Sequence, residues 1–241
     1  MTATTFGLVH AAWHGAWCWD RLVPELEGRG FPCVAVDLPT RAPSCGGRES
    51  ALMMHHALDD AGDVVLVGHS LGGLVIPILA TLRPVRLLVY LAPFVPEPGR
   101  SMAQQLAEGT TFAPGWPALA SRQIRHPDGA VSWPEDAAVD AFYHDCTPED
   151  ARWAAGMLRP QVWTLLREPA PPEGWPAVDS VAIACLDDRV LDADRIRQIS
   201  RERFGKPALE IPGGHCPFLA RPPELAALLA GLAAGATSGS A

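Results

Sequence analysis

Several features common in other classes of protein are missing from this chain of 241 residues. It has no run of 18 or more apolar residues, so we expect no membrane-spanning segment. Its first ten residues lack the basic and apolar regions of a signal peptide, which favours a cytoplasmic location. The 19 Lys and Arg residues are outnumbered by 27 Asp and Glu, giving a formal net charge of −8. A basic surface for nucleic acid is therefore not expected.

Motifs for metals and cofactors are also missing. The chain contains neither H-E-x-x-H nor a G-x-G-x-x-G that follows a strand, so we predict no metal ion and no nucleotide cofactor. The six cysteines are scattered with no C-x-x-C pair, which indicates reduced thiols rather than a disulfide framework or a zinc site. The expected partner is a small-molecule substrate. Whether two copies of the chain form a homodimer is left open by the sequence.

What the chain does contain is an alternation of short apolar runs with helix-like stretches. The apolar runs predict strands at residues 6–10, 31–37, 64–67, 85–91, 181–185 and 208–211. The stretches between them predict helices at residues 19–28, 50–61, 71–82, 192–204 and 223–233. Nearly continuous apolar runs are typical of strands covered on both faces. The alternation therefore predicts an α/β protein with a mostly parallel sheet flanked by helices.

Residues 95–180 interrupt this alternation. The segment has no convincing strand, 12 acidic and 6 basic side chains, and helical patches at residues 135–144 and 148–158. It also holds five of the eight tryptophans: Trp116, Trp133, Trp153, Trp163 and Trp175. We interpret the segment as a mainly helical insertion, a lid, over a core made of residues 1–94 and 181–241.

The strongest local signal follows the third predicted strand. There the chain reads Gly68-His69-Ser70-Leu71-Gly72, a G-x-S-x-G motif between an apolar run and a helix-like stretch. In that context the motif predicts a nucleophile elbow, a sharp turn that exposes the serine hydroxyl. Glycines at both ends let neighbouring backbone approach closely. Ser70 is the candidate nucleophile, and the alternative is a solvated serine in a glycine-rich loop.

A nucleophilic serine needs a base and a group that orients the base. His215 is the best candidate for the base, because it lies in a glycine-rich loop directly after the last predicted strand. Two adjacent carboxylates, Asp187 and Asp188, follow the preceding strand. Either could orient the histidine, or instead be solvated in the loop or cap the next helix. We prefer Asp188, which lies 27 residues before His215.

An oxyanion formed at the serine needs two backbone N–H donors. Leu71, the residue after Ser70, is one candidate. Ala12, in the loop after the first predicted strand, is the other. The candidate substrate pocket is assigned to residues near these loops and in the insertion: Ala11, His14, Trp116, Trp133 and Cys216.

The residues around Ser70, Asp188 and His215 resemble those of the α/β-hydrolase superfamily. The sequence is similar to the branch that contains plant methyl-ester esterases, hydroxynitrile lyases and their bacterial relatives. The likeness runs along nearly the whole chain and includes residues 8–19 (LVHAAWHGAWCW), 67–73, 90–96 and 142–146. The resemblance implies an α/β-hydrolase fold, a lid in the inserted segment, and a catalytic triad of Ser70, Asp188 and His215.

Two positions depart from that branch. Its esterases usually carry Gly, and its hydroxynitrile lyases Thr, where this chain has Ala11. The lyases also carry Lys directly after the catalytic histidine, where this chain has Cys216. Neither the hydroxyl nor the ammonium group that would stabilise cyanide is therefore present, which disfavours cyanohydrin cleavage.

Three functions are compatible with these residues. The first is hydrolysis of a neutral, fairly apolar ester, thioester or lactone through an acyl-enzyme on Ser70, since the acidic, tryptophan-rich insertion would repel anionic substrates. The second keeps the scaffold and uses His215 as the base of a lyase, eliminase or cyclisation reaction. The third is a receptor-like protein that only binds a small molecule. We predict the first.

Overall fold

The computed structural model describes residues 3–42, 44, 46–109, 111–171 and 177–235, so Cys45 and Trp175 lie outside the described residues. Six strands form one sheet in the order β2-β1-β3-β4-β7-β8, and each neighbouring pair is parallel. They are β1 (Thr4–Val9), β2 (Cys33–Ala35), β3 (Asp63–His69), β4 (Leu87–Leu91), β7 (Asp179–Cys185) and β8 (Leu209–Ile211). The predicted parallel sheet is confirmed.

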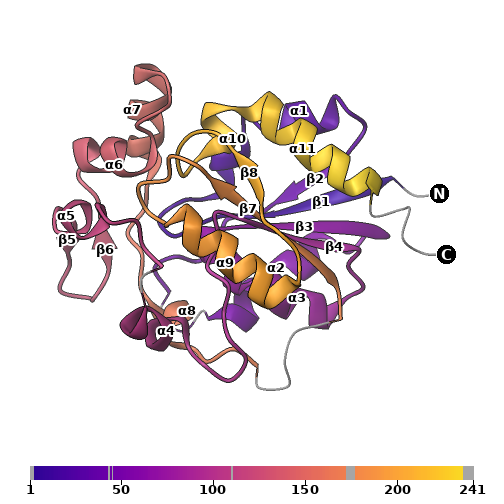
Figure 1. Cartoon of the computed structure of the whole chain (residues 1–241), viewed down its shortest axis with the longest axis horizontal. Coiled ribbons are helices and arrows are strands. Elements are labelled where there is room, and N and C mark those ends of the chain that lie inside the picture. The colour runs from indigo at the N-terminus through magenta and orange to yellow at the C-terminus, as the bar shows by residue number, and fades with distance from the viewer. Residues whose placement is uncertain (1–2, 43, 45, 110, 172–176, 236–241) are drawn as a thin grey trace.

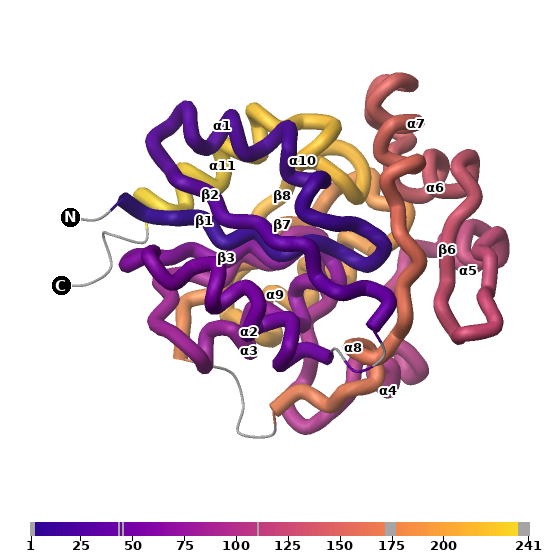
Figure 2. Tube along the Cα trace, turned by 180° about the vertical axis from the view of Figure 1, so that it is seen from behind, coloured from indigo at the N-terminus to yellow at the C-terminus, as the bar shows by residue number. Residues whose placement is uncertain are grey.

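Helices cover both faces of this sheet (Figure 1, Figure 2). One face carries α1 (Val23–Glu27), α10 (Pro217–Ala220) and α11 (Pro222–Gly235). The other carries α2 (Gly47–Ala57), α3 (Ile76–Leu82) and α9 (Ala193–Phe204). Val65, Leu66 and Val67 of β3 are fully shielded from solvent as a result, which explains why the strands are continuous apolar runs. No helix in the described part of the chain is long and apolar enough to span a membrane.

Several predicted elements form with different limits, and the helix expected at residues 50–61 lies earlier, as α2. The strand expected at residues 31–37 is reduced to β2. The helix expected at residues 19–28 divides into a 3-10 helix, η1 (Ala16–Trp19), and α1. The helix expected at residues 71–82 begins as a 3-10 helix, η2 (Ser70–Leu74), and continues as α3. Pro24 and Pro77 are the second residues of α1 and α3, in the first turn of each helix, where a missing backbone N–H breaks no intrahelical hydrogen bond.

Residues 95–180 form short elements: α4 (Met102–Glu108), α5 (Trp116–Ala120), β5 (Ile124–Arg125), β6 (Val131–Ser132), α6 (Glu135–Phe142), α7 (Pro148–Met157) and α8 (Thr164–Arg167). The expectation of no strand here was wrong for β5 and β6, which pair antiparallel. Their turn uses Gly129, whose φ of 81° suits glycine, and the His126 N–H donates to the Ala130 carbonyl oxygen at 2.9 Å. Strands of two residues are too short to produce an alternating sequence pattern.

The strand register brings the ends of β1, β3, β7 and β8 to one edge of the sheet. Val9 pairs with Gly68, and Cys185 pairs with Ile211. Because parallel strands all end at the same edge, the loops that follow these residues lie there together. In Figure 1 this edge faces α5 and α6, which lie beyond the strand ends. The candidate reactive residues are therefore placed between the sheet edge and residues 95–180.

Candidate active site

Ser70 lies at a strained turn between β3 and η2. Its φ of 51° is in the left-handed region, which costs a non-glycine residue about 1–3 kcal/mol. A Cβ on Gly68 would lie 2.7 Å from the Gly72 carbonyl oxygen, and one on Gly72 would lie 2.4 Å from that of Val9, so both positions require glycine. Leu71 is the second residue of η2, and its N–H is among those that a helix leaves without an intrahelical partner.

His215 is paired with Asp188 and not with Asp187. The His215 Nδ1 lies 2.7 Å from Asp188 Oδ2, and each side chain is only 2% exposed. The other oxygen of Asp188 accepts the backbone N–H groups of Val190 and Leu191 at 2.7 and 3.1 Å. Because an ionised carboxylate only accepts hydrogen bonds, the His215 proton lies on Nδ1, and Nε2 is left to act on a hydroxyl group.

Two further carboxylates hold the loop that carries the histidine. Asp187 Oδ2 accepts the N–H of Gly213 at 3.0 Å, and the Asp187 N–H donates to the Gly213 carbonyl oxygen at 2.9 Å. Asp145 Oδ2, which comes from the segment 95–180, accepts the N–H of Gly214 at 2.8 Å. Asp187 therefore positions the loop that carries His215, while Asp188 contacts the imidazole of His215.

His69 contacts the same loop from the side of the elbow. Its Nε2 donates to the His215 carbonyl oxygen at 2.9 Å, and the centroids of the two rings are 4.6 Å apart. Burial, together with the nearby His215, holds the pKa of His69 well below its ordinary value of 6.5. His69 is therefore neutral, so it adds no positive charge beside the candidate base, His215.

His10 orients the first peptide of the loop after β1. The Leu38 N–H donates to His10 Nε2 at 2.9 Å, so the His10 proton lies on Nδ1, which donates to the Ala11 carbonyl oxygen at 2.8 Å. Burial lowers the pKa of His10 to about 4 and keeps the ring neutral. Since the C=O and N–H of a trans peptide point in opposite directions, the Ala12 N–H points away from His10. It donates to no other described residue.

His14 orients the next peptide in the same manner. Its Nδ1 donates to the Ala12 carbonyl oxygen at 2.8 Å, and the Tyr143 hydroxyl donates to its Nε2 at 2.9 Å. Burial lowers the pKa of His14 to about 3. The N–H of the same peptide, on Trp13, donates to Gln161 Oε1 at 3.3 Å. Both ends of this peptide are thus bonded, in contrast to the free Ala12 N–H before it.

A cavity of about 170 Å³ joins the two loops. Ser70, His215 and Ala12 all line it, so the candidate nucleophile, base and oxyanion donor share one space. Half of the other lining residues are tryptophan or phenylalanine: Trp13, Phe94, Phe112, Trp116, Phe142 and Trp163. No carboxylate, ammonium or guanidinium group is among the described lining residues. Within the described ranges, no group of three or more His, Cys, Asp or Glu side chains is arranged to hold a metal ion.

The five predicted pocket residues divide into two groups. Ala11, His14 and Trp116 line the cavity. Trp133 and Cys216 lie one layer behind it: the Trp133 ring packs 5.6 Å from Trp116, and Cys216 Sγ lies 3.8 Å from His14 Nε2. Sequence reasoning missed five of the six aromatic side chains in the wall, and no local pattern marks them among the other aromatic residues.

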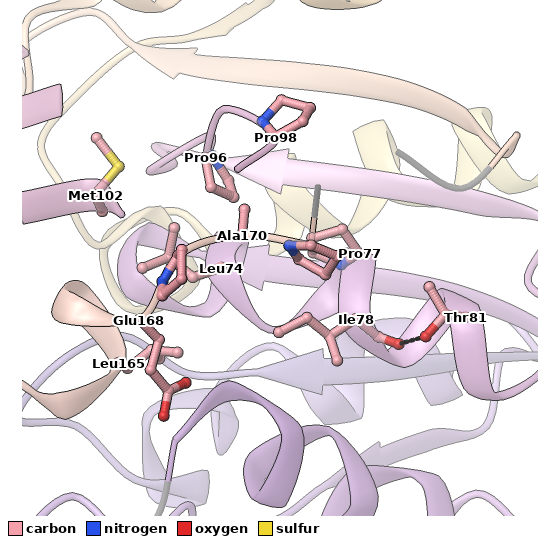
Figure 3. Close-up of a pocket in the computed structure, with 12 residues that line it drawn as sticks. Leu74, Pro77, Ile78, Thr81, Pro96, Pro98, Met102, Leu165, Glu168 and Ala170 are labelled. Atoms are coloured by element: carbon pink, nitrogen blue, oxygen red, sulfur yellow. Dashed lines mark hydrogen bonds between the residues drawn. The ribbon is translucent and has the colours of Figure 1, made fainter. Parts of the chain in front are cut away.

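A second hollow, of about 40 Å³, lies between α3 and α8 and is separate from this cavity (Figure 3). Its wall includes Pro77, Ile78 and Leu165, and neither Ser70 nor His215 lines it. Glu168, at its rim, accepts the N–H of Gly47 at 2.7 Å and so holds the start of α2. The Glu168 carboxylate therefore binds the N-terminal end of α2.

The fold and the site together define an architecture: a parallel sheet, a serine at a strained strand-to-helix turn, and a buried histidine–aspartate pair following later strands. These are the marks of an α/β-hydrolase. The model of the alpha/beta hydrolase family matches residues 8–228, and the chain belongs to this family.

Relatives match along nearly their whole length. A pyrethroid hydrolase from Sphingobium wenxiniae is 29% identical, over 97% of this chain and 89% of that protein. Methylesterase 3 from Arabidopsis thaliana is 28% identical, over 92% and 93%. An alpha-hydroxynitrile lyase from the same plant is 27% identical, over 91% and 93%. A crystal structure of a pyrethroid hydrolase from Sphingobium faniae superposes with a TM-score of 0.77 at 26% identity, covering 97% of this chain and 98% of that one. The chain is an enzyme of the α/β-hydrolase family.

The bond from Asp145 to the histidine loop leads to a stability prediction. Asp145→Ala leaves the Gly214 N–H without its acceptor, which should lower the free energy of unfolding by about 1–3 kcal/mol. Asp145→Asn keeps an acceptor oxygen and should lose less. Urea unfolding followed by tryptophan fluorescence measures both variants, and equal losses for alanine and asparagine would contradict the role of this hydrogen bond.

The buried neutral histidines predict a loss of stability in weak acid. In the unfolded chain a histidine takes up its proton near pH 6.5, but the folded protein lowers the pKa of His10 to about 4 and that of His14 to about 3. Below pH 6.5 unfolding therefore takes up protons, and each histidine lowers the free energy of unfolding by up to about 1.4 kcal/mol per pH unit. Urea titrations at pH 7, 6 and 5 test this, and a constant free energy over that range would refute it.

Proposed function

We propose that the protein hydrolyses a small to medium, neutral carboxylic ester through an acyl-enzyme on Ser70. The observation that carries the proposal is the shared cavity of Ser70, His215 and Ala12, with Asp188 bonded to the histidine at 2.7 Å. Relatives named as a pyrethroid hydrolase and a methylesterase support ester hydrolysis.

Each residue then has a defined role in the reaction. As Ser70 Oγ attacks the ester carbonyl carbon, His215 Nε2 takes the hydroxyl proton, while Asp188 holds the imidazole and stabilises its positive charge. The backbone N–H groups of Ala12 and Leu71 donate to the oxyanion. The alcohol leaves with the proton from His215. Water then attacks the acyl carbon of the acyl-enzyme while the same histidine takes one of its protons. As the bond from the acyl carbon to Ser70 Oγ breaks, His215 returns that proton to the serine, and the acid leaves with the oxygen and the other proton of the water.

The wall of the cavity favours a neutral, apolar substrate. A charged group would lose its water there without gaining an oppositely charged partner among the described lining residues. The acidic side chains of residues 95–180 give weaker support, because they include exposed, paired groups such as Asp136 and Asp140, which contact Arg122 at 2.8 and 2.6 Å. The substrate preference therefore follows from the cavity wall more than from the net charge of the insertion.

We infer that residues 95–180 act as a lid on a core of residues 1–94 and 181–241. Phe112, Trp116, Phe142 and Trp163 come from this segment and line the cavity. The Trp13 ring, from the loop after β1, packs against Phe142 and Trp163 with centroids 5.6 and 5.1 Å apart. These aromatic contacts join the segment to the loop that carries the oxyanion donor.

A lyase or elimination reaction with His215 as the base is the second candidate. A relative named alpha-hydroxynitrile lyase supports it. However, the side chain after the histidine is the Cys216 thiol, which is never positively charged and so supplies no charge to stabilise a leaving anion. Ester hydrolysis is therefore placed first.

Removal of the nucleophile tests the reaction class. Ser70→Ala should abolish labelling by a fluorophosphonate and lower kcat for p-nitrophenyl butyrate by about 10⁴-fold or more. Ser180→Ala, which changes a serine on β7 outside the cavity, is the matched control and should retain both activities. Full turnover in Ser70→Ala would assign the chemistry to His215 alone. Wild-type protein that is neither labelled nor active would instead indicate a binding protein.

The adjacent aspartates provide a second, internally controlled test. Asp188→Asn should lower kcat by about 10⁴-fold, because an amide in place of the carboxylate favours the wrong tautomer of His215. Asp187→Asn keeps an oxygen that can accept the Gly213 N–H, so we expect a loss of less than about tenfold. Both rates are measured with p-nitrophenyl butyrate. A larger loss in the Asp187 variant would reverse the assignment.

A further inference from the structure

Gln123 lines the same cavity and differs chemically from the aromatic residues of its wall. Among the described lining residues it is, besides Ser70 and the two histidines, the one whose side chain both donates and accepts hydrogen bonds. No hydrogen bond joins its side-chain amide to another described residue. Two other lining residues with polar atoms are already bonded: the Trp13 Nε1–H donates to the Val131 carbonyl oxygen at 2.9 Å, and both ring nitrogens of His14 have partners.

The position of Gln123 continues the cavity-facing side of α5. Trp116, Ala120 and Gln123 all line the cavity, and they are four and three residues apart, the spacing of one helix face. The chain keeps a helical path beyond Ala120, because the Gln123 N–H donates to the Ala120 carbonyl oxygen at 3.2 Å. The Trp116 ring stacks on Phe112 with centroids 5.2 Å apart. The row therefore runs from a stacked aromatic pair to the amide of Gln123, a half-buried residue.

An amide at the end of an apolar row discriminates between ligands. A ligand that covers the amide removes its water, and a ligand without a polar group there leaves it unpaired. A ligand that supplies a hydrogen-bonding oxygen at that point should be favoured about three- to tenfold. An ionic group gains less, because no opposite charge among the described lining residues offsets its loss of water.

We propose that Gln123 binds a neutral oxygen-bearing group, an ether, ketone or hydroxyl, which the substrate carries on an apolar skeleton away from its ester carbonyl. The inference rests on the ester hydrolysis proposed above, in that it places the ester at Ser70. It narrows the substrate class from neutral esters in general to esters with a second, distal oxygen function.

The test uses pentyl pentanoate and the analogues in which one CH₂ group of either chain, separated from the ester group by at least one carbon on the acyl side and two on the alcohol side, is replaced by an ether oxygen. Hydrolysis is followed by titration of the released acid. One oxygen position should raise kcat/KM about three- to tenfold over the all-carbon ester in the wild type, and Gln123→Leu should remove that preference. Comparison of the two enzyme forms cancels any intrinsic reactivity of the ethers. Gln198→Leu, whose native amide donates to Glu202 on α9, is the control and should keep the preference.

A binding experiment separates this inference from the proposed hydrolysis. The same esters are titrated into Ser70→Ala and Ser70→Ala/Gln123→Leu, with quenching of the cavity tryptophans as the signal. A preference for one ether in the first form that is lost in the second supports the role of Gln123, even if the wild type hydrolyses none of the esters. Hydrolysis with the same preference in wild type and Gln123→Leu overturns the inference and leaves the proposed function standing. Equal binding of all esters by Ser70→Ala also overturns it.

Discussion

The close approach of backbone segments around Ser70 is the constraint on which the site depends. The Gly72 backbone lies against the Val9 carbonyl oxygen, and a Cβ on Gly73 would lie 2.2 Å from the carbonyl oxygen of Phe94. The Phe94 N–H in turn donates to the Ser70 carbonyl oxygen at 3.0 Å. The ends of β1, β3 and β4 are thus packed onto one turn. The strain at the serine persists because this packing leaves the turn no alternative conformation.

Buried neutral histidines are the second organising feature. His10, His14 and His69 each donate one ring N–H to a backbone carbonyl oxygen, and burial lowers the pKa of all three. A neutral imidazole can donate through one nitrogen and accept through the other, so it orients a peptide without adding charge. His215 differs from these three in being bonded to a buried carboxylate, Asp188. The environment, and not the residue type, thus separates the candidate base from the positioning histidines.

Much of the fold follows from local sequence signals, and the site follows only in part. The buried strands, the elbow at Ser70 and the late position of His215 could be predicted, because burial on both faces and the turn leave marks within a few residues. Asp187 and Asp188 could not be separated with certainty, since both accept backbone N–H groups and only the loop conformation decides which one meets the histidine. The aromatic wall was largely missed, because it is assembled from residues far apart in the chain. The limits of helices shifted where prolines and 3-10 turns intervened.

Residues 95–180 line the cavity and also contact the loops that carry the candidate base and oxyanion donor. Asp145 bonds to Gly214 beside His215, and the Tyr143 hydroxyl bonds to His14 in the loop that presents the Ala12 N–H. Burial raises the pKa of Tyr143 well above its ordinary value, so the hydroxyl stays protonated and keeps its role as donor. These polar contacts lie next to α6, whereas Trp116 and Gln123 lie in and after α5. Phe142, the last residue of α6, lines the cavity and directly precedes Tyr143. The part of residues 95–180 around the end of α6 therefore shapes the wall and contacts the loops of the candidate site at the same time.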